Sequence, residues 1–313
     1  MRIGLDITPL LGNRTGVGTF CWNWARCLVG FQPELELYGF ASGLKRLSED
    51  DTRFFHCVRR LPLPTRSLYR LWDFVHAPAV DRFLPPIDVY HATNYYLPPT
   101  LKARRILTVY DLVFLRYPQY CSPKVVGPFC RNVLKFSREA DAVITCSESS
   151  RRELIEMGQV PAERVFVAYG GVDQGVTYPM KENAHQTLYR KYGLRGPFLL
   201  YVGTLEPRKN IRGIVGAFSR IAGEFPVNLV LVGGMGWKID DFKSQLENSE
   251  YHDRIVLPGY VPALDLPFFY RAAEAFLFPS FYEGFGLPVA EALACGTPPR
   301  HYFRPFVFAG GCR

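Results

Sequence analysis

The chain has 313 residues, of which 48% are hydrophobic and 15% aromatic, so it can bury a core and is not a disordered protein. Its net charge of +8 favours anionic partners, but no zinc finger, RNA-binding sequence or long basic run indicates nucleic acid. Eight scattered cysteines without C-x-x-C and six histidines without metal-ligand spacing predict neither disulfides nor a metal site. No apolar run approaches the roughly 20 residues that cross a bilayer, and a signal-peptide core is missing, so we expect a cytoplasmic protein.

Short β-branched runs alternate with helical stretches along the whole chain. The first series of predicted strands covers residues 2–7, 35–40, 88–93, 104–111, 141–147 and 164–171. A second series covers residues 198–205, 228–234, 254–260 and 275–280. Helices are predicted at 147–158, with Ser147 as N-cap and Gly158 as stop, and at 211–225.

This alternation predicts parallel sheets built from βαβ units, and the series restarts near residue 196. We therefore expect an α/β protein with two Rossmann-like domains, residues 1–172 and 196–298, joined by a linker at 173–195. Ligands of such sheets bind at the carboxyl ends of the strands, so the facing cleft is the expected site.

Three glycine-containing loops follow predicted strands. GNRTGVGTF (12–20) could bring backbone N–H groups to a phosphate, although Cys21 stands where the dinucleotide fingerprint requires a third glycine. In GTLEPRKN (203–210), Arg208 and Lys209 precede a helix start with Asn210 as a possible cap, and two such cations would neutralise a diphosphate. LVGGMGWK (231–238) indicates close backbone approach. Each loop also fits a plain turn.

The segment EGFGLPVAEALACGTP (283–298) is the most organised in the chain. Pro288 suits a first helical turn and Gly296 a C′ position, which predicts a helix over about 288–295. Glu283 then lies in the preceding loop and Glu291 near the helix start. The loop amides could hold a phosphate or sugar oxygen, and Glu291 could accept both hydroxyls of a ribose diol.

This segment resembles the E-x7-E signature of the retaining GT-B glycosyltransferases of family 4, also called group 1. Further stretches resemble the bacterial mannosyltransferase-like branch, among them VYHAT, LTVYDLVFLRYP, YVGTLEPRKN and GYVPALDLPFFYRAAEAFLFPS. The resemblance covers nearly the whole chain up to Pro298. It implies the GT-B fold, with an acceptor-side first domain and a nucleotide-sugar-binding second domain.

The resemblance also implies site residues. Lys209, assisted by Arg208, matches the cation on the donor diphosphate, Glu291 the acid on the nucleotide ribose, and Glu283 the acid near the transferred sugar. The expected catalytic residues are Glu283, Tyr110 and Asp111, with His91 on the acceptor side. The remaining expected donor contacts come from both domains and are Gly16, Gly18, Gly203, Thr204, Gly284, Phe285, Gly286 and Leu287.

From the resemblance we expect no cofactor and no metal, because fixed cations and helix dipoles stabilise the departing nucleoside diphosphate. The expected reaction transfers a hexose with retention, from a nucleotide-sugar, with GDP-mannose favoured, to a glycan or lipid-linked acceptor in surface polysaccharide synthesis. The basic chain would make peripheral contact with the anionic inner face of the membrane.

The sequence departs from the family in two places. LTVYDL carries Tyr110 where the family has a histidine near the transferred sugar, which predicts impaired turnover. The ending from Arg300 to Arg313 lacks the family's continuation toward L-P-E-V. With suitably chosen codons, reading one base later gives VITSDLSSLPEVVG. We therefore interpret residues 299–313 as an out-of-frame tail and the second domain as incomplete.

Two alternatives stay open at this point. One is a catalytically inactive, frameshifted remnant of such an enzyme, which Tyr110 and the tail favour. The other, weaker alternative is a nucleotide-dependent dehydrogenase, with Glu36 at a plausible distance from Gly16 for a ribose contact.

Overall fold

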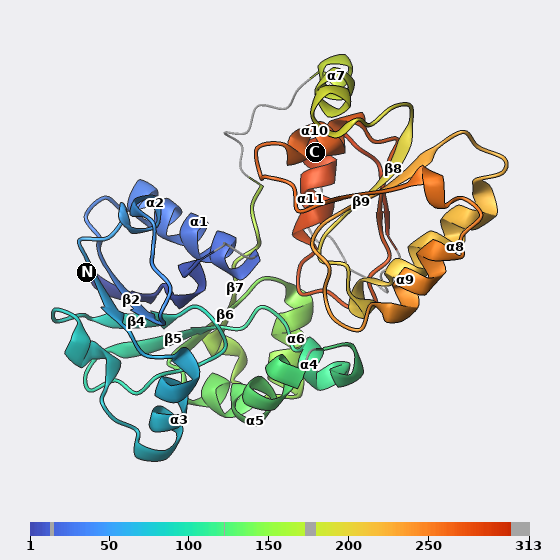
Figure 1. Ribbon diagram of the computed structural model, residues 1–313. Helices are drawn as coiled ribbons and strands as arrows, with labels where there is room; N and C mark the ends of the chain where they lie inside the picture. Colours follow the sequence, from blue (N-terminus) through green and yellow to red (C-terminus); the bar gives the residue numbers. More distant parts are fainter. Residues whose placement is uncertain (13–15, 122, 173–179, 302–313) are drawn as a thin grey trace. The chain divides into compact units, whose positions relative to one another are not determined.

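The structure is a computed structural model that describes residues 1–12, 16–121, 123–172 and 180–301. The chain forms two compact units. The first comprises Met1–Arg116 and Pro123–Gly170, and the second comprises Tyr117–Ser122 and Gly171–Arg313. Each contains one parallel sheet with helices, so the predicted pair of Rossmann-like domains is confirmed (Figure 1).

The sheet of the first unit has seven strands in the order β3-β2-β1-β4-β5-β6-β7. Each pairs in parallel with its neighbour; Ile3 of β1, for example, lies opposite Leu37 on one side and Val89 on the other. The strands are β1 (Arg2–Asp6), β2 (Glu36–Ser42), β3 (Cys57–Leu61), β4 (Val89–Ala92), β5 (Arg104–Thr108), β6 (Ala142–Thr145) and β7 (Val165–Val167). The helices are α1 (Gly16–Phe31), α2 (Glu49–Thr52), α3 (Thr65–Val75), α4 (Val113–Arg116), α5 (Pro123–Glu139) and α6 (Glu148–Glu156).

The sheet of the second unit has five parallel strands in the order β10-β9-β8-β11-β12. They are β8 (Phe198–Val202), β9 (Asn228–Val232), β10 (Ile255–Gly259), β11 (Ala275–Phe278) and β12 (Pro299–His301). The helices are α7 (Lys181–Tyr192), α8 (Ile211–Ile221), α9 (Asp240–Glu247), α10 (Leu266–Ala272) and α11 (Leu287–Ala294), with a 3-10 turn, η5 (Pro207–Lys209).

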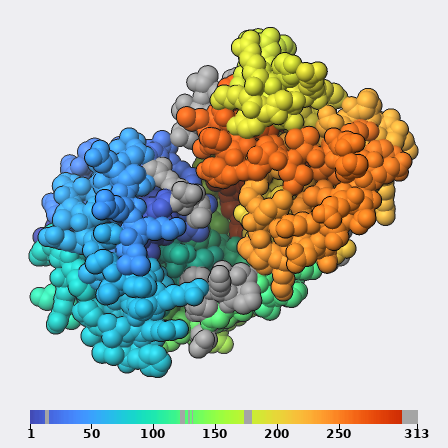
Figure 2. All heavy atoms as spheres, in the orientation of Figure 1, coloured from blue at the N-terminus to red at the C-terminus, as the bar shows by residue number. Residues whose placement is uncertain are grey.

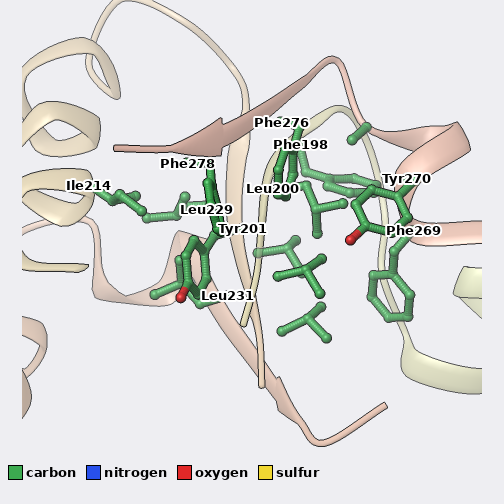
Figure 3. Packing of buried hydrophobic residues seen from close by; sticks show 14 of the residues in the cluster. Phe198, Leu200, Tyr201, Ile214, Leu229, Leu231, Phe269, Tyr270, Phe276 and Phe278 are labelled. Atoms are coloured by element: carbon green, nitrogen blue, oxygen red, sulfur yellow. The ribbon is translucent and has the colours of Figure 1, made fainter. Parts of the chain in front are cut away.

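The core of the second unit is rich in aromatic rings (Figure 3). Phe276 and Phe278, alternate residues of β11, stack at 5.7 Å between ring centroids, and Tyr270 of α10 meets Phe276 edge to face at 5.4 Å. Tyr201 of β8 stacks on Phe278 at 6.2 Å. Large buried rings contribute strongly to hydrophobic stabilisation, so this packing fixes the strand ends from which the loops emerge.

Local signals read from the sequence are reproduced at several helix ends. The Ser147 hydroxyl accepts from the Ser150 amide and caps α6, although the helix ends at Glu156, before Gly158. Gly296 follows α11 at φ 74°, a left-handed conformation that favours glycine. Asn210 precedes α8 at φ 56°, but its side chain makes no capping hydrogen bond.

The expected linker at 173–195 is wrong in its extent, because the stretch contains α7, which belongs to the second unit. The helix is held on α10 by side chains that meet Asp265, since Lys191 Nζ lies 2.6 Å and Tyr192 Oη 2.7 Å from its carboxylate. Residues 173–179 of the expected linker lie outside the described residues.

The expected tail also begins inside an element, because Pro299, Arg300 and His301 form β12, which pairs with Phe276–Phe278 of β11. The rest of the expected tail, from residue 302, lies outside the described residues. None of the described helices combines the length and apolar character that a bilayer crossing requires.

Candidate active site

A compact cluster of charges lies at the carboxyl edge of the second sheet. Lys209 Nζ lies 2.5 Å from one oxygen of Glu283, and Arg208 Nη1 lies 3.1 Å from the other. These side chains are 11%, 17% and 9% exposed for Lys209, Arg208 and Glu283. The structure thus brings together three residues that the sequence analysis assigned to donor binding and catalysis, although the loops that carry them are far apart in the sequence.

Glu206 is a fourth member that the sequence analysis missed. Its Oε1 lies 2.8 Å from Arg208 Nη2 and 3.0 Å from Nε, so one carboxylate oxygen accepts from two nitrogens on the same edge of the guanidinium. Burial raises the pKa of Glu206 above its ordinary value, and the cations Arg208 and Lys209 oppose that rise. The available signal was an acid two residues before Arg208 in GTLEPRKN, but only the fold shows that the side chain turns toward the guanidinium.

Backbone contacts fix the position of this cluster. The Phe281 amide donates to the carbonyl of Arg208 at 2.9 Å, and Arg208 Nη1 donates to the Tyr282 carbonyl at 2.9 Å, which ties η5 to the loop before α11. The ammonium of Lys209 lies 4.9 Å from the centroid of the Phe278 ring, a favourable cation–π arrangement.

Close backbone packing at the same edge explains two glycines. Gly203 and Gly233 follow β8 and β9 at φ 149° and 144°. A Cβ on Gly233 would lie closer to the Gly203 carbonyl oxygen than real Cβ contacts allow. The GTLEPRKN and VGGMGW loops therefore touch here through their backbones, and Thr204, the second residue of the first loop, is exposed.

The electrostatics of Glu283 follow from its partners. Burial alone would raise the pKa of this carboxyl, but the neighbouring Lys209 and Arg208 outweigh that effect and hold its pKa below the usual 4.5. Glu283 is thus anionic at neutral pH. Both cations are already neutralised by carboxylates, so an entering diphosphate would have to compete with Glu283 for them.

Glu291 has a different environment, although it belongs to the same signature. It lies in α11, which starts after Gly286 at φ 85°, and its Oε2 accepts from the Tyr270 hydroxyl at 2.7 Å. Burial raises the pKa of Glu291, partly offset by that hydrogen bond. Among the other expected donor residues, Gly284 and Gly286 are buried, whereas Phe285 and Leu287 are partly accessible.

Tyr110 and Asp111 lie in the first unit, just after β5. The Tyr110 hydroxyl donates to the Thr93 carbonyl at 2.7 Å, and its ring meets Phe20 of α1 edge to face at 5.1 Å. Burial raises the pKa of Tyr110 well above its ordinary value of 10, so the group is a neutral donor at physiological pH. Asp111 Oδ1 accepts from the Val113 amide at 3.1 Å, at the start of α4.

His91 is a buried residue of β4, 2% exposed. Its Nε2 lies 2.7 Å from the Thr108 hydroxyl, and burial lowers its pKa to about 4. The imidazole is therefore neutral and lies against Trp24 of α1, whose ring it meets edge to face at 5.6 Å, and a role toward an acceptor stays a prediction. Gly16 and Gly18 occupy the first turn of α1, while residues 13–15 of their loop lie outside the described residues.

A cavity of about 620 Å³ lies beside the charge cluster within the second unit. Glu206, Asn210, Arg212 and Asp241 contribute polar groups to its lining, and Phe281 contributes an aromatic face. Lys209, Glu283 and Glu291 do not line it, so this cavity adjoins the cluster without containing it.

The short segment Tyr117–Ser122 forms part of the second unit through aromatic contacts. Tyr120 stacks on Phe281 at 5.0 Å and Tyr117 meets Tyr282 at 5.7 Å, immediately before Glu283 in the sequence. In the part of the chain that the structure describes, no group of three or more His, Cys, Asp or Glu side chains could hold a metal ion. The expectation that the reaction needs neither metal nor cofactor stays a prediction.

Two family profiles match the chain. The profile "Glycosyltransferase Family 4" matches residues 14–175, and "Glycosyl transferases group 1" matches residues 189–299. Together they span most of both units, and the second covers the whole charge cluster. These matches leave the dehydrogenase alternative without support.

Individual relatives agree with these profiles. The O-antigen chain mannosyltransferase B of Escherichia coli is 35% identical over 95% of this chain and 81% of its own length. Anabaena HepE, solved with UDP and glucose, superposes with a TM-score of 0.68 at 18% identity, over 96% of this chain and 80% of HepE. WaaG, a glycosyltransferase of lipopolysaccharide biosynthesis, superposes with a TM-score of 0.70 at 15% identity, over 96% of this chain and 80% of WaaG. This chain therefore belongs to the group 1 glycosyltransferases, family 4, with the GT-B fold.

Proposed function

We propose that the chain is a retaining hexosyltransferase that moves mannose from GDP-mannose to a glycan or lipid-linked acceptor during surface polysaccharide synthesis. The observation that carries the proposal is the cluster of Arg208, Lys209 and Glu283 at a strand-end loop of the second sheet. Two fixed cations suit a diphosphate leaving group, and a carboxylate beside them suits the transferred sugar. The choice of mannose rests on the 35% identical relative, which is named an O-antigen chain mannosyltransferase.

Each cluster residue has a defined part in the proposed reaction. Lys209 and Arg208 bind the diphosphate and stabilise the charge that develops on it as the bond to the sugar breaks. Glu283 orients the sugar, and Glu291, held by Tyr270, accepts the ribose hydroxyls. The departing phosphate takes the proton of the acceptor hydroxyl, so the chain needs no separate base.

The test is a transfer assay with the purified full chain. GDP-mannose and UDP-glucose are offered in parallel with mannose-terminated oligosaccharide acceptors, and products are identified by mass spectrometry and by the anomeric signals in NMR. The proposal expects an α-linked product from GDP-mannose and loss of that product in Lys209→Ala. Transfer from UDP-glucose alone would overturn the proposed donor, GDP-mannose. A product with inverted anomeric configuration would overturn the proposed retaining mechanism.

A second candidate is a chain that binds the donor but does not transfer the sugar. Tyr110 favours it, because its hydroxyl is committed to the Thr93 carbonyl and its pKa lies well above 10. Saturable GDP-mannose binding by calorimetry without product formation would support this candidate.

We also propose that the protein is cytoplasmic and contacts the anionic inner face of the membrane, where a lipid-linked acceptor would be presented. The net charge of +8 supports attraction to such a surface. Cell fractionation before and after a high-salt wash tests it, since an electrostatically bound protein moves to the soluble fraction.

A further inference from the structure

Helix α3 of the first unit is anchored by one face only. Leu68 and Trp72, one turn apart, are 2% and 4% exposed, and Trp72 Nε1 donates to the Pro78 carbonyl at 2.8 Å. These contacts fix the rotation of the helix about its axis. The opposite face must therefore point away from the core of the unit.

That outward face combines arginines with large apolar side chains. Arg66, Arg70 and Phe74 follow one another at four-residue spacing, and Leu63 extends the row before the helix begins. Phe74 is 84% exposed and Leu63 47% exposed. Single exposed apolar residues are normal, but Leu71 and Val75 are exposed as well, so four of them lie within 13 consecutive residues.

The loop after β2 is joined to the start of α3. The Thr65 hydroxyl donates to the Ser42 carbonyl at 2.6 Å, and Arg60 Nη1 donates to the carbonyls of Leu44 and Lys45 at 3.1 and 3.0 Å. This loop contributes an exposed leucine and two exposed cations. We call the combined region the α3 surface, which consists of Leu44, Lys45, Arg46, Leu63, Arg66, Arg70, Leu71, Phe74 and Val75.

The charge of the region is positive. Residues 57–76 contain four arginines and a single acid, Asp73, whose Oδ1 accepts from the Tyr96 hydroxyl at 2.9 Å. Beyond the loop, α2 carries three acids. Asp51 is buried in a capping box with Ser48, Asp50 pairs with Arg53 at 2.9 Å, and Glu49 is exposed. The α3 surface therefore presents exposed apolar groups surrounded by cations, which suits an anionic, partly apolar partner.

Topology places this surface at the functional edge of the first sheet. β2 and β3 run parallel to β5, so their carboxyl ends, Ser42 and Leu61, lie on the same edge as Tyr110. The α3 surface starts from those two strand ends, and the segment that contains it forms part of the face of the first unit seen in Figure 2. A surface that held this edge against a bilayer would bring the carboxyl ends of the first sheet, where Tyr110 lies, to a lipid-linked substrate.

We propose that the α3 surface docks on an anionic phospholipid bilayer, with Phe74 entering the headgroup layer and Arg66 and Arg70 pairing with lipid phosphates. This assigns the surface for the membrane contact proposed above and rests on that function for its purpose, but it is tested without any substrate. A protein partner is the competing occupant, and the apolar and cationic groups are interleaved here as a headgroup layer requires.

The chain offers matched controls on the opposite edge of the same sheet. Phe31 ends α1, before β2 begins, and is 82% exposed, nearly the same as Phe74. Lys102 and Arg104 are exposed cations at the amino end of β5, with the Arg104 side chain 79% exposed. Phe74→Ser is thus compared with Phe31→Ser, and Arg66→Gln/Arg70→Gln with Lys102→Gln/Arg104→Gln.

The experiment is co-sedimentation of the full chain with vesicles of phosphatidylcholine, with and without phosphatidylglycerol. We expect binding only to the anionic vesicles, a loss of roughly 30-fold for Arg66→Gln/Arg70→Gln and about tenfold for Phe74→Ser, with both controls close to wild type. Equal losses in the controls, or no binding to anionic vesicles, would overturn the proposal. So would α3 variants that bind vesicles normally but lose a self-association seen by light scattering.

Circular dichroism and thermal melts verify that the variants fold. Transfer to a water-soluble acceptor, measured on the same samples, separates the two proposals. An α3 variant that loses vesicle binding but still transfers the sugar to the water-soluble acceptor supports docking. A variant that binds vesicles but no longer transfers the sugar to that acceptor counts against the α3 surface as the membrane-binding surface. A wild type that binds vesicles but transfers nothing leaves the docking surface in place and counts against the proposed function.

Discussion

Glu283→Gln should destabilise the free protein and at the same time strengthen its affinity for a nucleoside diphosphate. Glu283 lies 2.5 Å from Lys209 and 3.1 Å from Arg208, and its side chain is 9% exposed. Glutamine keeps the shape but removes the charge. Arg208 retains Glu206 at 2.8 Å, so the variant leaves chiefly Lys209 as a buried cation without a compensating carboxylate.

The size of the loss has a ceiling set by the proton on Lys209. Removing one partner of a buried ion pair costs about 3–5 kcal/mol. Lys209 can avoid this cost by losing its proton. From its ordinary pKa of 10.5, deprotonation costs about 5 kcal/mol at pH 7 and about 2 kcal/mol at pH 9. The lysine is charged in the unfolded chain, so the penalty should shrink as the pH rises toward that value.

The assay is chemical denaturation of wild type and Glu283→Gln at pH 7 and pH 9, together with calorimetric titration of GDP. We expect a loss of about 3–5 kcal/mol in the free energy of unfolding at pH 7, a loss of no more than about 2 kcal/mol at pH 9, and GDP binding about tenfold tighter. Glu291→Gln is the matched control, since Glu291 contacts the Tyr270 hydroxyl, and it should weaken GDP binding. Unchanged stability together with weaker GDP binding in Glu283→Gln would refute the reasoning.

Three further predictions concern single side chains. Tyr270→Phe removes the hydrogen bond that lowers the pKa of Glu291. The loss of GDP affinity on acidification, followed by calorimetry from pH 5 to 8, should therefore begin at a higher pH in this variant. An unchanged pH dependence would show that protonation of Glu291 does not affect GDP binding. Tyr110→His should raise the transfer rate at neutral pH, and a variant no faster than the parent would contradict the assignment of that position. His91 has a pKa of about 4 when folded and 6.5 when unfolded, so the unfolded chain binds the extra proton in that window. The free energy of unfolding should therefore fall by up to about 3 kcal/mol as the pH drops from 6.5 to about 4. Chemical denaturation at the two ends of this range measures the fall, and the contribution of His91 to it should be missing in His91→Gln.

Much of the fold could be predicted because parallel sheets leave a strong local pattern. Buried strands are short β-branched runs, and the alternation with helices sets the sheet type without any knowledge of contacts. The predicted strands of both series are present, shorter at most carboxyl ends because the loops there leave the ladder early. β3 was missed because its sequence, CVRRL, is that of an edge strand with two arginines, and such strands carry no apolar run.

Errors arose where tertiary contacts override weak local signals. The stretch around α7 has few apolar residues, and in the fold Ala184 and Leu188, one turn apart, are buried in the core of the second unit while Lys191 and Tyr192 meet Asp265 of a distant segment. Asn210 precedes a helix but adopts a left-handed conformation, so its backbone makes the turn and its side chain does not cap. For α7 the deciding contacts lie outside any local window.

The sequence by itself determined the α/β class, the two units, the start of α11 and the residue types from which the site is built. Those follow from propensity, spacing and helix-end chemistry, which act over a few neighbouring residues. Only the tertiary structure decided that Lys209 meets Glu283 across 74 residues of chain, that Glu206 holds Arg208, and that His91 is buried against Trp24 of α1. The reason is that electrostatic and burial effects depend on distance in space, and packing of the strands, not order along the chain, sets those distances.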